Sequence, residues 1–212
     1  MGTRTGNELN RVLDELKRFG FLLESDARLP NVCGIITGQT MKGSWWSHPQ
    51  AHAIFAINEL LADHADVLLT KLISGKVTFV HRQLWRQIYA IGVSREEWQL
   101  KGLSAAARLL LRKVDTVGSL PAHELGPSFG VKPGATVREL ENRLLIHAEQ
   151  FHTTSGAHSK LLETWETWAK RTKFRPRPIS VARARRTIEQ RLDELNEKLD
   201  GKGRLPWPRN FL

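Results

Sequence analysis

The 212-residue sequence predicts a mostly helical α+β fold, with an N-terminal α/β domain that contains a hairpin, a second domain of short helices and a ribbon, and a C-terminal helix. Apolar residues recur at helical spacing in several segments. Two β-rich runs flank a Ser-Gly pair, and two further strand-like runs flank a glycine turn. We expect domains over residues 1–102 and 103–169, followed by a basic linker, a helix and a tail over residues 170–212.

The N-terminal domain is predicted to begin with a helix over residues 7–23, whose apolar residues share one face. Residues 27–44 are rich in Pro, Gly and Thr, which predicts a loop with one short strand at VCGII. A second helix is expected to start at Ser47 or His48, beside Pro49, and to run to Asp63.

A β-hairpin is predicted next, because VLLTKLI and KVTFV are rich in β-branched residues and Ser74-Gly75 lies between them. RQLWRQIYAIG returns to helical spacing. Ser94 and Glu97 then form a capping-box pattern, which predicts another short helix.

The second domain has a different order of elements. Ser104 can cap a helix over LSAAARLLLRKVDTVGSL, Pro121 suits the start of a second short helix, and Thr136 with Glu139 forms a capping pair for a third. LLIHAEQFH, TTSG and AHSKLLETW then predict a strand, a glycine turn and a strand.

Three short helices followed by a ribbon resemble the winged helix-turn-helix superfamily over residues 103–165. The resemblance implies a fold whose third helix enters the DNA major groove and whose ribbon touches the backbone or minor groove. WW, GKVTFVHRQLWRQIYAIG and HTTSG are also similar to AlkZ-like winged-helix proteins, some of which are DNA glycosylases. Those glycosylases are expected to carry Gln-apolar-Gln or Gln-apolar-Asp. None of the seven glutamines here is followed two positions later by Gln or Asp.

Charge is concentrated in one part of the chain. The net charge is +10, and residues 170–191 carry nine Lys or Arg against one acid, Glu189. Such a tract favours a polyanionic partner, because each phosphate it neutralises releases counterions. The alternatives are a solvated basic linker and an anionic membrane or acidic protein as partner.

Composition excludes several kinds of site and a membrane-spanning protein. Cys33 is the single cysteine, which excludes an intrachain disulfide and a Cys-based zinc cluster. No apolar run reaches the length of a membrane span. We therefore expect a cytoplasmic protein with no cofactor, no metal and no membrane association.

The leading hypothesis is a duplex-DNA-binding protein in DNA repair or regulation. Its candidate contacts lie on the third helix, on the ribbon and in the basic tract. They are Arg138, Asn142, Arg143, Ser155, His158, Lys160, Lys170, Arg171, Lys173, Arg175, Arg177, Arg183, Arg185 and Arg186. Arg and Asn suit guanine and adenine edges, whereas Lys and Arg suit phosphates.

Two alternatives stay open. One is a nucleic-acid-processing, glycosylase-like enzyme, whose N-terminal pocket would contain Trp45 and the catalytic candidates Trp46, His48, Lys71 and His81. An exposed Trp could stack on a flipped base, and a buried Lys could act as a base. The other is a protein-interaction module, because the helix over residues 180–199 could pair with a second copy as a homodimer or pack within its own chain.

His48 and His52 are spaced to share a helical face, and three further histidines lie on the proposed ribbon. A metal site would need additional ligands, and the sequence offers no HExxH motif and no cysteine to assist. Surface or supporting roles are therefore expected for these histidines.

Overall fold

The computed structural model describes residues 3–41, 43–126, 129, 133–152 and 158–208. Its chain is mostly helical α+β, as the sequence predicts, with two small antiparallel sheets. Two compact units are present. The first comprises Met1–Gln87 and Ala182–Leu205, and the second comprises Ile88–Val181 and Pro206–Leu212. The predicted division at residues 102 and 169 stays a prediction.

The first unit is built on a three-stranded sheet in the order β1-β3-β2. Its strands are β1 (Phe21–Leu23), β2 (Val67–Thr70) and β3 (Thr78–His81). Its helices are α1 (Thr3–Phe19), α2 (Val32–Thr37), α3 (Ala51–Ala62) and α9 (Val181–Leu199), with single turns at Trp45–Ser47 and Arg82–Leu84. Apolar residues of α1, α2 and α3 form one core with the sheet, which includes Leu16, Ile57 and Phe79.

The predicted hairpin is confirmed, although its strands are shorter than expected. β2 and β3 pair antiparallel from Val67 opposite His81 to Thr70 opposite Thr78. Ser74 and Gly75 both have positive φ, at 53° and 66°, which is the geometry for which a Gly-containing turn is suited.

Two N-terminal predictions are wrong. The first helix ends at Phe19 and not at residue 23, because Gly20 takes a φ of +83° and the chain then enters β1, which pairs with β3. The segment VCGII forms helix α2 and not a strand. Asn31 explains the difference, since its side chain accepts a hydrogen bond from the Gly34 N–H at 2.8 Å and caps α2.

The C-terminal helix α9 matches its prediction closely and packs within its own chain. Ile188, Leu192 and Leu195 are buried. Beyond its end, a Cβ added to Gly203 would lie within 3.0 Å of Leu29, Leu192 and Ile73 side chains, so the returning chain is tightly packed there. Three of the apolar positions considered for a homodimer, Ile188, Leu192 and Leu195, are therefore already covered within one chain.

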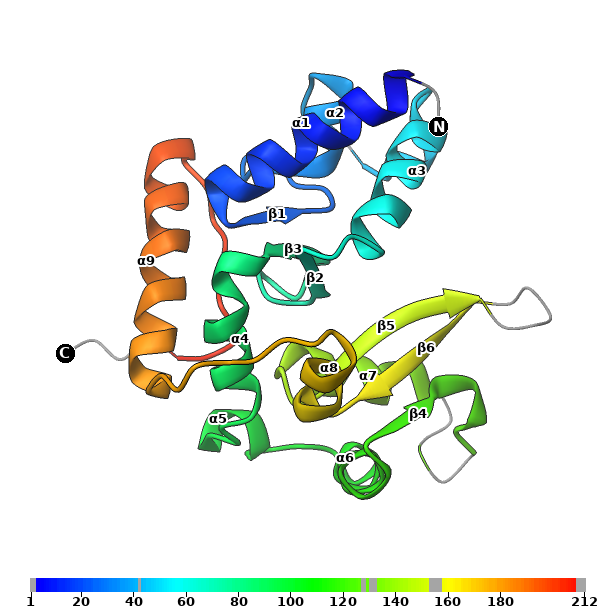
Figure 1. Ribbon diagram of the computed structural model, residues 1–212, viewed down its shortest axis with the longest axis vertical. Coiled ribbons are helices and arrows are strands. Elements are labelled where there is room, and N and C mark those ends of the chain that lie inside the picture. Colours follow the sequence, from blue (N-terminus) through cyan, green and yellow to red (C-terminus); the bar gives the residue numbers. More distant parts are fainter. Residues whose placement is uncertain (1–2, 42, 127–128, 130–132, 153–157, 209–212) are drawn as a thin grey trace. The chain divides into compact units, whose positions relative to one another are not determined.

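The second unit contains a sheet in the order β4-β6-β5. Its strands are β4 (Ser119–Pro121), β5 (His147–His152) and β6 (His158–Glu163). Its helices are α4 (Trp85–Gly92), which begins in the first unit, α5 (Glu97–Leu100), α6 (Ala105–Val117), α7 (Pro133–Asn142) and α8 (Trp165–Arg171), with a single turn at Ala122–Glu124. The ribbon is confirmed, and β5 and β6 extend as a pair in Figure 1.

Helix α6 also follows its prediction. The Ser104 hydroxyl accepts a hydrogen bond from the Ala107 N–H at 3.1 Å, which caps the helix. Its apolar face is buried in the core of the second unit against β4, α7 and the ribbon. Trp207 of the tail is likewise buried, with its ring centroid 5.7 Å from that of Trp98.

Pro121 ends strand β4 and is the N-cap of the single helical turn at Ala122–Glu124, so the short helix predicted at Pro121 is present as one turn. Two other local predictions in this unit are wrong. The capping box of α5 uses Glu96 with Gln99, whose side chain accepts from the Glu96 N–H at 2.8 Å, and not Ser94 with Glu97.

Thr136 and Glu139 do not cap α7, which begins at Pro133. Thr136 lies inside the helix and donates to the Phe129 carbonyl at 2.9 Å. The Glu139 carboxylate instead accepts from the N–H and the hydroxyl of Ser104, at 2.9 and 2.8 Å. Glu139 therefore supports the start of α6, a contact across 35 residues.

Within the described ranges, no helix combines the length and the apolar character that crossing a membrane would require.

Candidate nucleic-acid interface

The two arginine candidates on and just after helix α7 differ in their surroundings. Arg138 is exposed, and its guanidinium has no partner among the residues that the structure describes. Arg143, just beyond α7, donates to the carbonyls of Trp98, Gln99 and Lys101 at 3.1, 3.2 and 2.6 Å. It therefore satisfies the otherwise unpaired carbonyls at the end of α5. Asn142 is half-buried, and its Oδ1 is buried without a hydrogen-bond partner in the described part of the chain.

Of the ribbon candidates, the structure describes the side chain of Lys160 alone. Lys160 on β6 forms an ion pair with the buried carboxylate of Glu141, with N–O distances of 2.7 and 2.8 Å. His158 begins β6 opposite His152. Ser155 lies outside the described residues.

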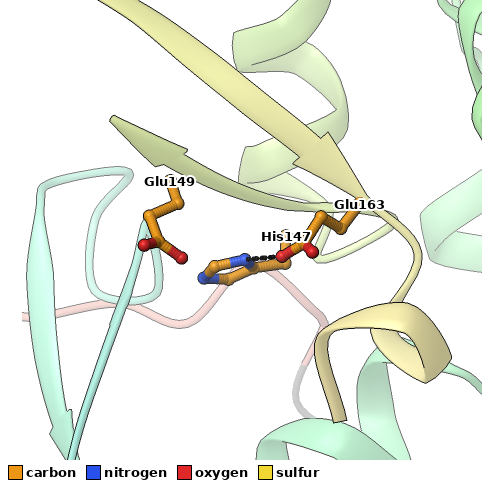
Figure 2. A group of neighbouring side chains, drawn as sticks. All are labelled: His147, Glu149 and Glu163. Atoms are coloured by element: carbon orange, nitrogen blue, oxygen red, sulfur yellow. Dashed lines mark hydrogen bonds and ion pairs between the residues drawn. The ribbon is translucent and has the colours of Figure 1, made fainter. Parts of the chain in front are cut away.

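Arg171 forms ion pairs with Glu149 and Glu163 at the base of the ribbon. Figure 2 shows these two carboxylates beside His147. His147 and Glu163 are opposite each other on β5 and β6, and His147 Nδ1 lies 3.3 Å from Glu163 Oε2. Arg171 Nε and Nη2 donate to Glu163 at 2.9 and 2.8 Å, and Nη2 also bonds to Glu149. The side chains of His147 and Glu163 are only 3% and 1% exposed.

Burial of Glu163 is compatible with its charge because of these contacts. Burial alone would raise the pKa of Glu163, but hydrogen bonds from His147 and Arg171 outweigh it and hold the pKa below its ordinary value of 4.5. The hydrogen bond to Glu163 is the main cause that raises the pKa of Arg171. The rings of Trp165 and Trp168 lie beside His147, and each ring centroid is 5.8 Å from that of His147.

The same residues raise the question of a metal. One ligand atom each from His147, Glu149 and Glu163 lies within 4.8 Å of the others. However, Arg171 already binds both carboxylates, and it would have to leave before a cation could take its place. The arrangement is therefore better described as a buried ion-pair network than as an open metal site.

His48 precedes α3, so the predicted helical pairing of His48 with His52 is wrong.

The cations on either side of Arg171 contrast with this network. Lys170, Lys173 and Arg175 are exposed, and no partner for their side-chain charges occurs among the described residues. Phe174 fixes the segment, since its N–H donates to the Ala169 carbonyl at 2.8 Å and its ring lies 5.6 Å from that of Trp168. These cations are therefore available to an external anion.

Comparison with known proteins identifies the family. A family model described as AlkZ related matches residues 6–203. The chain belongs to the AlkZ-related family. Neither the curated proteins nor the solved structures contain a match. Membership relates this AlkZ-related protein to DNA repair and points to nucleic acid as its partner.

Helix α9 of the AlkZ-related protein also carries both kinds of cation. Arg185 is buried, with its Nε 3.8 Å from the Glu189 carboxylate. Arg186 is exposed and has no charge partner within the described part of the chain. Arg177 and Arg183 are exposed but interact within the protein.

The paired tryptophans of the first unit take different environments. Trp45 is buried, whereas Trp46 is 62% exposed, and their stacked rings are 4.0 Å apart with an angle of 23° between them. Phe55 of α3 lies 5.7 Å from the Trp46 ring. The structure therefore leaves one large aromatic face of this AlkZ-related protein open to solvent.

The two histidine candidates serve local hydrogen bonding. His48 Nδ1 accepts from the Gln50 N–H at 3.1 Å, and its Nε2 lies 3.0 Å from Gln39 Nε2. His81 Nδ1 accepts from the Gln83 N–H at 3.3 Å, which caps the turn at Arg82–Leu84. Burial lowers the pKa of His81, although Asp66 opposes this.

Glu24 is a functional candidate that the sequence did not single out. It follows β1, accepts a hydrogen bond from Trp45 and lies 3.5 Å from Asn58 Nδ2. Burial raises the pKa of Glu24, although the Trp45 hydrogen bond and the charge of Lys71 oppose the shift. Burial and Glu24 together raise the pKa of the Cys33 thiol to about 11, so this cysteine is not an activated nucleophile. The signal that could have identified Glu24 is its position directly after the buried apolar strand β1.

Proposed function

We propose that this AlkZ-related protein binds duplex DNA and acts in DNA repair or its regulation. The observation that carries the proposal is a set of exposed cations on the second unit, Lys170, Lys173 and Arg175, whose charges have no partner within the described ranges. Such cations gain binding free energy from phosphates because they release condensed counterions. Family membership supports nucleic acid as the partner.

The order of elements supports a winged-helix interpretation of the second unit. Helix α6, strand β4, helix α7 and the ribbon β5–β6 follow one another, and the sheet has the order β4-β6-β5. In this interpretation α7 is the groove helix and its exposed Arg138 contacts DNA. Arg143 and Lys160 instead support the fold, because their charges are used by carbonyls and by Glu141.

The test is fluorescence anisotropy with a labelled duplex, matched single-stranded DNA and matched RNA at several salt concentrations. Duplex DNA is expected to bind most tightly. Each phosphate contact should contribute about a threefold loss of affinity when salt rises from about 50 to 200 mM. Absence of duplex binding at low salt would contradict the proposal and favour a protein-interaction module.

A second candidate function is a base-processing, glycosylase-like enzyme. The observation that favours it is the convergence of Glu24, Trp45, Asn58 and Lys71 from four segments of the first unit. A carboxyl whose pKa lies above 4.5 is a better proton acceptor at neutral pH than an ordinary one. In hydrolysis of an N-glycosidic bond, Glu24 would take a proton from water while the water oxygen bonds to C1′. The C1′–N bond would break with its electron pair going to the base, which would then take a proton from solvent or from the Glu24 acid.

This activity is testable with duplexes that contain methylated or deaminated bases. The readouts are free base by mass spectrometry and alkali-labile sites. Glu24→Gln and Lys71→Ala are expected to lose the product, whereas the exposed His52→Gln should keep it. If the unmodified protein releases no base from any of these duplexes, or if Glu24→Gln keeps full activity, the second candidate fails.

A further inference from the structure

A polar cavity that opens widely to solvent lies in the second unit. It has a volume of about 600 Å³. Its walls come from the end of α6, from α8 and from the residues after α4. Polar and charged side chains dominate the lining, and those that matter here are Arg95, Asp115, Thr116, Glu166, Thr167 and Lys170.

Arg95 is the least satisfied residue of this wall. Its Nη2 forms an ion pair with Asp115 at 2.7 Å. Its Nη1 is buried and has no hydrogen-bond partner among the residues that the structure describes. A buried, charged donor without an acceptor is unfavourable and calls for a bound water, ion or ligand. The backbone of Arg95 is also strained, with a φ of +54°.

Lys170 supplies a second cation to the same cavity. It lies on α8, it is exposed, and no ion-pair partner for it occurs in the described part of the chain. It is also the first cation of the basic segment that continues through Lys173 and Arg175. The cavity is therefore continuous in sequence with the surface proposed to contact DNA.

The charges of the lining restrict the ligand. Arg95 and Lys170 face two acids, of which Asp115 is already paired with Arg95 and Glu166 is exposed. The formal charge of the lining is therefore zero, which favours a singly charged anion over a doubly charged one. A phosphodiester carries one negative charge, whereas a terminal phosphate carries about two at neutral pH.

We infer that this cavity binds one backbone phosphodiester of the DNA, with Arg95 and Lys170 as donors. The inference rests on the proposed DNA-binding function and extends it to a defined phosphate contact. Glu166 then opposes binding, so the site has one residue whose removal should weaken DNA binding and one whose removal should strengthen it.

The test compares duplex affinities of two variants with matched controls. Lys170→Gln should lower the affinity and reduce the slope of log K against log salt by about 1. Glu166→Gln should raise the affinity above that of the wild type. Lys101→Gln and Glu97→Gln are the controls, because this exposed pair lies in the same unit but outside the cavity. Thermal melting of each variant checks that the fold is kept.

A second arm separates the backbone from a free nucleotide as the source of phosphate. Backbone amide shifts of Arg95, Thr116 and Thr167 are followed by NMR during titration with dimethyl phosphate or with dAMP. Larger shifts with dimethyl phosphate are expected. Larger shifts with dAMP, or no shift with either probe, overturn the inference even if the protein does not bind duplex DNA.

If the duplex binds but Lys170→Gln and Glu166→Gln behave like their controls, the cavity inference fails while the proposed function stands. If the wild type binds no duplex, the proposed function fails, and the NMR arm alone decides whether the cavity recognises a phosphodiester.

Discussion

Arg171 and Arg175 lie four residues apart in the same basic tract, yet they are in opposite environments. Arg171 binds Glu163 and Glu149, and the Glu163 side chain is only 1% exposed. Arg175 lies on an exposed segment, and no acidic partner for it occurs among the described residues. The difference teaches that a run of positive charge can contain both fold-stabilising cations and cations available to a ligand.

The largest loss of stability is expected when Arg171 is replaced. Arg171→Ala would leave the buried Glu163 carboxylate with His147 as its remaining side-chain hydrogen-bond partner among the described residues. We expect the free energy of unfolding to fall by about 3 kcal/mol, near the lower limit for breaking a buried pair, because the guanidinium is 39% exposed. Urea denaturation measures this loss.

Arg175→Ala is the matched control, and its free energy of unfolding should change by no more than about 0.5 kcal/mol. Equal stabilities for the two variants would mean that the network around Arg171 contributes nothing to the fold.

A smaller effect is expected at Arg143. Its guanidinium donates to three carbonyls at the end of α5, so Arg143→Ala should cost about 1–3 kcal/mol of stability. DNA affinity should stay near that of the wild type. Arg138→Ala should show the reverse pattern, because Arg138 is exposed and free of partners within the described residues. A loss of affinity for Arg143→Ala with unchanged stability would contradict these assignments.

The pH dependence of stability offers a finer test of the Glu163 network. The pKa of Glu163 is lowered in the folded protein from its ordinary value of 4.5. Its contribution is therefore fully present above pH 4.5 and is lost as the pH falls through the lower, folded pKa.

Glu163→Gln should be less stable than the wild type at pH 7, and its stability should fall less steeply below pH 4.5. Urea midpoints between pH 3 and 7 measure this difference. Parallel curves for the two proteins would show that Glu163 is not preferentially ionised in the folded state.

Local sequence patterns predicted much of the fold. The Ser104 cap, the apolar face of α6, the hairpin around Ser74-Gly75 and the limits of α9 all follow from residues near in sequence. Predictions were wrong where a nearby residue changed the backbone conformation, or where a side chain bonded to a residue distant in sequence and not to its expected local partner. Gly20 ended a helix, and Glu139 supported Ser104 across 35 residues.

The candidate interface was less predictable for the same reason. Charge density identified the region of Lys170–Arg177, but the acids that bind Lys160 and Arg171 come from other elements. The carbonyls that hold Arg143 lie more than 40 residues earlier. Glu24 was missed because its surroundings, Trp45, Asn58 and Lys71, come together only in the folded chain.

The most direct test of the central claim is the salt dependence of duplex binding for the wild type and for Lys173→Gln/Arg175→Gln. Lys198→Gln/Lys202→Gln is the control with the same change in charge. The first double variant should reduce the slope of log K against log salt by about 2, because two phosphate contacts are lost. The control should keep the wild-type slope. Equal slopes for all three proteins would contradict the claim that the unpartnered cations of this segment bind phosphate.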